Sequence, residues 1–237
     1  MTTGSIRRAG GTQRIPAPHS RHDAGKPLWD NRSVEFSLDS LISTVADRAE
    51  PLGAISSPRP DERISSVLAL LAPGPNGAEV LLTRRSSSLN NHSGEMSFPG
   101  GRVDEGESII EAALRETHEE VGIDSSLITV HGRLSPLSTF VSRSYIVPIV
   151  ASVEYKPELT LCDSEVERAV WVPLVELVRS DTFSWEWWSF STAELSSNRP
   201  MFFFHLDDET VWGATARILH ELLCVLHRVE VLELPNW

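Results

Sequence analysis

Residues 98–122, FPGGRVDEGESIIEAALRETHEEVG, constrain this chain more than any other segment. The spacing of their apolar residues predicts a helix that starts at Glu107 and ends at Gly122, because glycine readily adopts the left-handed conformation that closes helices. The predicted core-facing stripe recurs at helical intervals and consists of Ile110, Ala113, Leu114, Thr117 and Val121. A short, amphipathic, strongly acidic helix is therefore expected directly after a glycine-rich turn.

The acidic side chains of this helix need an explanation. Glu116, Glu119 and Glu120 fall at i, i+3 and i+4, so the three carboxylates lie together and repel one another. Either this face is simply solvated, or it holds a cation. Clustered carboxylate oxygens suit Mg²⁺ or Mn²⁺. The preceding FPGG, whose backbone can approach a ligand closely, and the adjacent Arg115 favour the cation site.

The order of these residues resembles the Nudix box. Gly101 is followed after five residues by Glu107, and after seven more by the run RETHEEVGI that begins at Arg115. The box reads G, five of any residue, E, seven of any, then REUxEExGU, where U is a bulky apolar residue. Only Thr117 departs from it, at a U position where its methyl group can still pack. So many fixed positions make this a specific motif.

The resemblance implies a fold, a reaction and a cofactor. Nudix hydrolases are α/β/α sandwiches with a mixed β-sheet, in which the box forms a loop-helix-loop. They hydrolyse a nucleoside diphosphate linked to another moiety, with Mg²⁺ or Mn²⁺. By position, Glu116 and Glu120 resemble the principal metal ligands, Glu119 a further ligand or the base that activates water, and the carbonyl of Gly100 an additional ligand.

Two other box residues have a supporting role by the same resemblance. Arg115 and Glu107 would form a salt bridge that orients the carboxylates. We therefore expect Glu116, Glu119 and Glu120 to be the catalytic residues, in a reaction without a covalent intermediate. The sequence offers no Ser-His-Asp or Cys-His arrangement.

The residues before the box resemble a signature of one branch of the family. Residues 81–101, LLTRRSSSLNNHSGEMSFPGG, follow the coenzyme A pyrophosphatase pattern LLTxRSxxxRxxxGxxxFPGG except at Asn90, where that pattern has arginine. The implied activity is hydrolysis of coenzyme A or acyl-CoA to 3′,5′-ADP and 4′-phosphopantetheine or its acyl form. Arg84, Arg85 and Gly101 are the expected substrate contacts. Alternation along a strand predicts that only one of the two arginines points into the site.

Two alternatives to this function stay open. Asn90 removes a cation that would contact a phosphate, which leaves room for another nucleoside diphosphate derivative such as NADH or ADP-ribose as the substrate. A regulatory protein that uses the fold only to bind a ligand is the other alternative. It is less favoured, because the box retains all three carboxylates.

The rest of the chain predicts a single domain with an arm. Residues 1–35 are rich in Gly, Pro, Arg and Ser, which predicts a disordered or loosely docked arm. Residues 36–237 should form the Nudix domain with an N-terminal helical extension. Apolar runs separated by the turn signal PGPNG predict a β-hairpin. The expected strands are 64–72, 78–85, 126–134, 145–153, 166–174 and 200–206, and the final helix is 208–227.

Composition excludes some partners. The formal net charge of −12 argues against a nucleic-acid-binding protein, and no apolar run is long enough to span a membrane. Cys162 and Cys224 match no metal-ligand pattern, which predicts buried free thiols in a cytoplasmic protein. The expected partner is a small-molecule substrate, and a homodimer is left open.

Four further features have two interpretations each. Glu165 is either an additional carboxylate of the site or a surface acid on a loop. His92 and His118 are either functional residues of the site or solvated side chains, and histidines at such positions are more often solvated. The Trp-rich segment 184–190 could stack on an adenine, although a core or dimer contact is the favoured interpretation.

Overall fold

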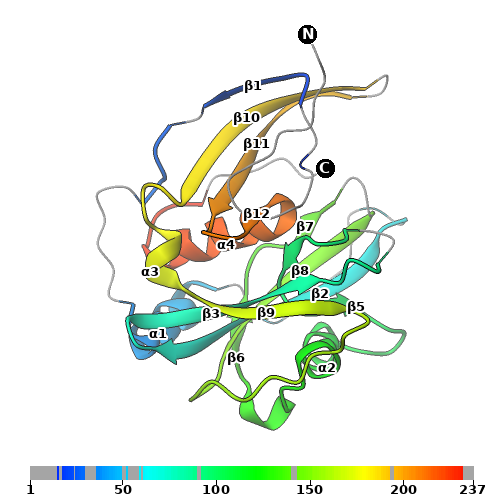
Figure 1. Ribbon diagram of the computed structural model, residues 1–237, viewed down its shortest axis with the longest axis vertical. Coiled ribbons are helices and arrows are strands. Elements are labelled where there is room, and N and C mark those ends of the chain that lie inside the picture. The colour runs from blue at the N-terminus through cyan, green and yellow to red at the C-terminus, as the bar shows by residue number, and fades with distance from the viewer. Residues whose placement is uncertain are drawn as a thin grey trace.

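The hairpin predicted at PGPNG is present and begins the larger of two sheets (Figure 1). Its arms are β2 (Arg63–Gly74) and β3 (Gly77–Arg85), which pair with each other only near their turn and then diverge. Two short strands fill the opening: β4 (Met96–Ser97) pairs with β3, and β5 (Gly100–Arg102) pairs with β2. The glycine-rich start of residues 98–122 therefore lies between β2 and β3, inside the larger sheet.

The structure is a computed structural model. It describes residues 15, 18–23, 25–29, 36–49, 52, 59, 61–89, 92–139, 143–192 and 195–231, with the backbone alone at 190–192 and 195–198. In these residues four more strands complete the larger sheet. β8 (Ser144–Ser152) runs parallel to β2, and both β6 (Thr129–Arg133) and β7 (Leu137–Ser138) pair antiparallel with β8. On the other side of the sheet, β9 (Val166–Pro173) pairs antiparallel with β3. The predicted mixed sheet is confirmed.

Helices cover both faces of this sheet, as the predicted α/β/α arrangement requires. Central strands such as β2 are buried on both faces, so they read as continuous apolar runs. Leu68 and Leu70 belong to the core under α2 (Ile109–Val121), whereas Ala69 and Leu71 belong to the core on the other face. That second core includes α1 (Leu38–Arg48) and α4 (Gly213–Leu226). Two short helical turns lie in connections: η1 (Ser125–Leu127) between α2 and β6, and α3 (Leu174–Leu177) between β9 and β10.

A second sheet lies beyond α4 and was only partly predicted (Figure 1). Its strand order is β1 (Ser20–Asp23), β10 (Phe183–Thr192), β11 (Leu195–His205) and β12 (Thr210–Trp212), all antiparallel. The sequence predicted a strand only at 200–206. The predicted final helix was too long at its start, because 210–212 pair with β11 and the helix begins at Gly213, whose φ is +65°.

The Trp-rich segment is a strand rather than a ligand cover. Trp188 is buried beside Phe203, and the Trp185 ring stacks on Phe202. Aromatic residues on both faces of a strand obscure the two-residue alternation by which strands are usually predicted. The structure therefore supports the interpretation of segment 184–190 as a hydrophobic cover of the core.

The N-terminal region contributes to the second sheet where it is described. Ile15 and Trp29 are buried, and β1 pairs with β10. The division of the chain at residue 35 stays a prediction. In the described part of the chain, no helix is long and apolar enough to cross a membrane. Cys162 and Cys224 are both free, but only Cys224 is fully buried.

Candidate metal centre

Capping residues fix both ends of the acidic helix α2. Ser108 is the N-cap: its hydroxyl accepts from the Glu111 amide at 3.2 Å, while the Glu111 carboxylate accepts from the Ser108 amide at 2.8 Å. Gly122 ends the helix at φ +75°, where an added Cβ would lie 2.9 Å from Thr160. The helix therefore begins at Ile109, two residues later than predicted. The S-x-x-E capping box at 108–111 was the signal for this start, and it gives Glu111 a structural role.

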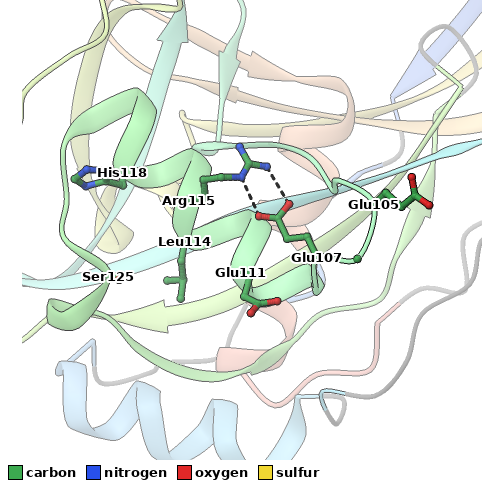
Figure 2. Close-up of a pocket in the computed structure, with 8 residues that line it drawn as sticks. Glu105, Glu107, Glu111, Leu114, Arg115, His118 and Ser125 are labelled. Atoms are coloured by element: carbon green, nitrogen blue, oxygen red, sulfur yellow. Dashed lines mark hydrogen bonds and ion pairs between the residues drawn. The ribbon is translucent and has the colours of Figure 1, made fainter.

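Arg115 ties the helix to the loop that precedes it. Its guanidinium donates two hydrogen bonds to the Glu107 carboxylate, of 2.8 Å from Nε and 3.1 Å from Nη2. Figure 2 shows this pair. Nη2 also donates to the Arg102 carbonyl at 3.0 Å, and Nη1 donates to Glu116 at 2.9 Å. These bonds to Arg115 lower the pKa of Glu107 and raise that of Arg115. The arginine thus fixes the orientation of Glu116.

An open pocket lies on this outer side of the helix (Figure 2). The Arg115–Glu107 pair forms one wall, and Glu105, Leu114 and His118 line it further. His118 is exposed, and its Nδ1 lies 3.2 Å from the Ile123 carbonyl. None of the pocket's lining residues is a carboxylate of the group described next, so this pocket is separate from the candidate centre.

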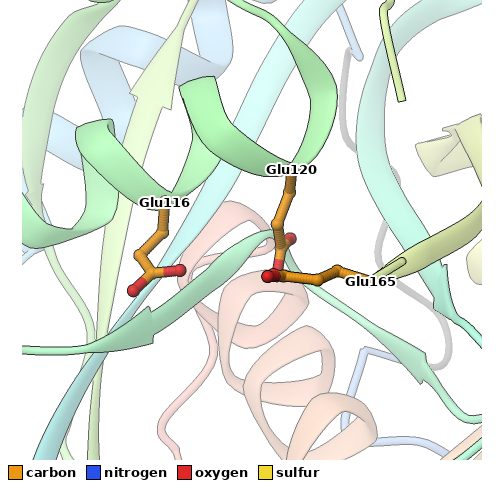
Figure 3. A group of neighbouring side chains, drawn as sticks. All are labelled: Glu116, Glu120 and Glu165. Carbon is orange, nitrogen blue, oxygen red and sulfur yellow. The ribbon is translucent and has the colours of Figure 1, made fainter. Parts of the chain in front are cut away.

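Three carboxylates from two parts of the chain meet beside α2 and form what we call the carboxylate cluster: Glu116, Glu120 and Glu165 (Figure 3). One oxygen of each lies within 4.8 Å of one oxygen of the others. Glu120 is buried, at 3% exposure, Glu116 is half-buried and Glu165 is exposed. A buried acid next to two exposed or half-exposed acids forms a site that opens to solvent on one side.

The buried member of the cluster lacks compensation for its charge. Burial raises the pKa of Glu120 to about 8; nearby Arg85 lowers it, and the Glu116 carboxylate raises it. Burial likewise raises the pKa of Glu116, against the lowering effect of Arg115. In the described part of the chain, the buried Oε2 of Glu120 has no hydrogen-bond partner. Hard oxygen donors around such an orphaned oxygen fit a divalent cation like Mg²⁺ or Mn²⁺.

Glu165 reaches the cluster through backbone contacts with the end of α2. The Cys162 amide donates to the Glu120 carbonyl at 3.0 Å, and the Glu165 amide donates to the Cys162 carbonyl at 2.9 Å. On the other side, the Ser86 amide donates to the Glu165 carbonyl at 2.8 Å. Of its two interpretations, the structure favours membership of the site. No local sequence signal could have placed it there, because the contact is tertiary.

Glu119 lies apart from the cluster. Its side chain is 54% exposed and accepts a 2.9 Å hydrogen bond from Arg115. The three box carboxylates therefore share a helix face but not one group: two of them meet Glu165 instead of the third. The role of Glu119 as a ligand or as the base stays a prediction.

Each of the two glycines of FPGG lies where a side chain would clash with a neighbouring group. Gly100 has φ +150°, and a Cβ there would lie 2.4 Å from the Ser66 carbonyl oxygen, because β5 runs against β2. At Gly101 a Cβ would lie 2.3 Å from the Glu116 carboxyl carbon. The Gly100 backbone also lowers the pKa of Glu120. Both glycines thus let the backbone touch the carboxylates, while the predicted metal contact of Gly100 and substrate contact of Gly101 stay predictions.

Arg84 and Arg85 have different surroundings at the end of β3. Arg84 Nη1 lies 3.0 Å from the buried carboxylate of Glu209, and its Nε lies 3.8 Å from Glu167. Arg85 is half-buried, its charge acts on Glu120, and its guanidinium has no hydrogen bond or ion pair with any residue that the structure describes. Arg85 is therefore the better candidate for contact with a substrate anion. Asn90, where the signature has arginine, lies outside the described residues.

Comparisons with known proteins show sequence similarity to one family. The NUDIX domain model matches residues 62–192. Nudix hydrolase 3 of Caenorhabditis elegans is 32% identical over 175 residues, which cover 68% of this chain and 72% of that protein. An uncharacterized Nudix hydrolase NudL of Photorhabdus laumondii is 35% identical over 145 residues, 60% of this chain and 74% of that protein. Among solved structures, the Nudix hydrolase RenU of M. smegmatis superposes with a TM-score of 0.43 and 23% identity, over 49% of this chain and 73% of that one.

Proposed function

The chain belongs to the Nudix family of hydrolases, and from that premise we propose that it cleaves the diphosphate of coenzyme A or acyl-CoA with the help of Mg²⁺ or Mn²⁺. The products would be 3′,5′-ADP and 4′-phosphopantetheine or its acyl form. One observation supports the metal dependence above all: the buried Oε2 of Glu120, which has no hydrogen-bond partner among the residues that the structure describes, lies beside Glu116 and Glu165.

The carboxylate cluster would hold the cation, with the Gly100 carbonyl as the predicted further ligand. When bound there, a divalent cation neutralises negative charge on the diphosphate and makes a bound water more acidic. The chain's own part is to hold the oxygens in place. Arg115 fixes Glu116 from one side, Gly101 leaves room for that carboxylate, and the Cys162 amide pins the segment that carries Glu165.

Two carboxylates are candidates for the base that takes the proton of the attacking water. Glu165 lies in the cluster and is exposed to solvent, so it can face both the water and the bulk. Glu119 is also exposed, but one of its oxygens is engaged by Arg115. A base must lie within hydrogen-bond reach of the water that it deprotonates. Position within the cluster therefore favours Glu165 as the base, with Glu119 as the alternative.

The substrate assignment rests on the signature at 81–101 and on Arg85. A half-buried guanidinium without a partner among the described residues is suited to a phosphate oxygen, which Arg can bind through two parallel hydrogen bonds. Arg84 is engaged by Glu209 and Glu167, which supports the expectation that only one of the two arginines serves the site. Asn90 is the feature that favours another nucleoside diphosphate derivative as the second candidate substrate.

The test is direct. Purified protein is incubated with coenzyme A and Mn²⁺ or Mg²⁺, and 3′,5′-ADP is measured by chromatography; parallel reactions contain NADH, ADP-ribose or excess EDTA. We expect turnover of coenzyme A that EDTA abolishes. Turnover of NADH or ADP-ribose without coenzyme A hydrolysis would refute coenzyme A as the substrate but would still agree with hydrolysis of a nucleoside diphosphate derivative. Turnover that survives EDTA would overturn the metal centre.

A further inference from the structure

The turn that leads from β3 to β4 presents a histidine beside Arg85. The Arg85 amide donates to the Glu95 carbonyl at 3.0 Å, and the Gly94 amide donates to the Arg85 carbonyl at 3.1 Å, so this end of the turn is closed by backbone bonds. His92 sits within it at φ +55°, in the left-handed region that residues other than glycine seldom adopt. The Glu95 amide donates to the His92 carbonyl at 3.2 Å and helps to hold this conformation.

The His92 ring is anchored by one nitrogen and presents the other. Nδ1 lies 3.0 Å from the Glu95 carboxylate, which makes Nδ1 the proton donor of that pair. The hydrogen bond to Glu95 raises the pKa of His92, although burial and the nearby Arg85 charge lower it. In the described part of the chain, Nε2 has no partner, and the side chain is 43% exposed. A protonated ring would therefore present a fixed N–H donor at Nε2.

Arg85 links this histidine to the carboxylate cluster. The backbone of Arg85 is hydrogen-bonded to Glu95 and Gly94, in the same turn as His92, and Glu95 also holds the His92 ring. The Arg85 charge lowers the pKa of both Glu120 and His92. With His92 protonated, Arg85, His92 and Glu95 carry a net charge of +1, and the two cations repel each other. An anion bound between the two cations would offset that repulsion. A dianionic phosphomonoester carries the charge and the acceptor oxygens for two such donors.

We propose that Nε2 of His92 and the guanidinium of Arg85 together bind a phosphomonoester group of the substrate, distinct from the diphosphate that is cleaved. This rests on the proposed function, because coenzyme A carries such a group as its 3′-phosphate. His92 would then supply, two residues later in the same turn, the positive charge that the signature places at position 90 and that Asn90 lacks. The contact makes His92 a determinant of substrate specificity.

Two substitutions of His92 distinguish the role of Nδ1 from the role of Nε2. In His92→Asn the short amide can still meet Glu95 in place of Nδ1, and asparagine tolerates the left-handed backbone, but nothing replaces Nε2. In His92→Gln the longer amide reaches the position of Nε2 and gives up the Glu95 contact. His22→Asn, an exposed histidine on β1, is the matched control.

The first experiment compares steady-state hydrolysis of coenzyme A and of dephospho-coenzyme A, which lacks only the 3′-phosphate. We expect His92→Asn to raise the KM for coenzyme A by about tenfold, the loss of one charge-assisted hydrogen bond, with kcat and all dephospho-coenzyme A kinetics within about twofold of wild type. His92→Gln should retain most of the discrimination. An equal effect of His92→Asn on both substrates would make His92 a loop anchor and overturn the proposal, as would no effect on either.

A second experiment does not need turnover. Calorimetric binding of 3′,5′-ADP and of 5′-AMP, which differ by the 3′-phosphate, is measured for the wild type and His92→Asn. Tighter binding of 3′,5′-ADP that His92→Asn abolishes would support the phosphomonoester contact even if coenzyme A is not hydrolysed, in which case only the proposed function fails. A wild type that binds both nucleotides equally would overturn the contact.

Discussion

Glu120→Gln should have opposite effects on stability in the absence and in the presence of metal. The wild-type carboxyl group is 3% exposed, and burial raises its pKa to about 8 from the ordinary value of 4.5. Between these two pH values the metal-free folded protein holds a proton that the unfolded chain releases. Its free energy of unfolding must therefore fall as pH rises from about 4.5 to 8, and stay low above that range.

The size of this loss follows from the same shift. At about 1.4 kcal/mol per pKa unit, the upper bound is about 5 kcal/mol, and relaxation around the charge should reduce it to about 2–3 kcal/mol. Glutamine has nearly the same shape and no charge, so the variant should lack this pH dependence. In EDTA we expect the two proteins to be similarly stable at pH 5, and the variant to be the more stable by about 2–3 kcal/mol at pH 8.5.

Metal should reverse the order. With Mn²⁺ at a thousand times its dissociation constant, the wild type gains about 4.1 kcal/mol, whereas the variant, without a charged ligand at this position, should gain little, so the wild type becomes the more stable protein by about 1–2 kcal/mol at pH 8.5. Urea denaturation followed by tryptophan fluorescence, at both pH values and with EDTA or Mn²⁺, measures all of these quantities. The exposed Glu119→Gln is the control and should change stability by less than about 1 kcal/mol. A variant destabilised at pH 8.5 in EDTA would refute the account of Glu120 as an uncompensated buried charge.

Three further predictions concern single contacts. Gly101→Ala should lower kcat/KM by about a hundredfold while the circular dichroism spectrum is retained, because the new Cβ displaces the Glu116 carboxylate; full activity would mean that this packing is unimportant. Ser108→Ala should reduce the free energy of unfolding in urea by about 1 kcal/mol, through loss of the capping box, and Ser108→Asp should restore it. Glu165→Gln should lower kcat by about a hundredfold or more if this residue is the base, and the same loss in Glu119→Gln alone would assign that role to Glu119.

The sequence predicted the parts of the site whose causes are local. Helix α2 was predicted from its apolar stripe and Gly122, and two of its acids do meet in the site. The predicted start lies two residues too early, because the N-cap at Ser108 sets the first helical residue and apolar spacing does not report it. A side chain that hydrogen-bonds a free amide fixes a helix start to one position.

The parts that were missed depend on contacts between distant segments. Glu165 joins the cluster because Cys162 hydrogen-bonds the end of α2, and no periodicity near residue 165 reports that contact. Residues 210–212 continue the helical pattern of α4 but pair with β11, so an available strand edge overrides local propensity. The Trp-rich segment reads as aromatic on both faces, because one face packs against Phe202 and the other against Phe203.

The attachment of residues 160–162 to the end of α2 has a consequence for how the chain tolerates change. The Thr160 and Cys162 amides cap the Val121 and Glu120 carbonyls at 2.9 and 3.0 Å, so the helix and the segment that carries Glu165 are joined directly. The stretch of chain between these two points does not set their distance. Insertions or deletions in the connections on either side of β6 should therefore leave the site unchanged, whereas proline at position 160 or 162, which removes the donor, should detach it.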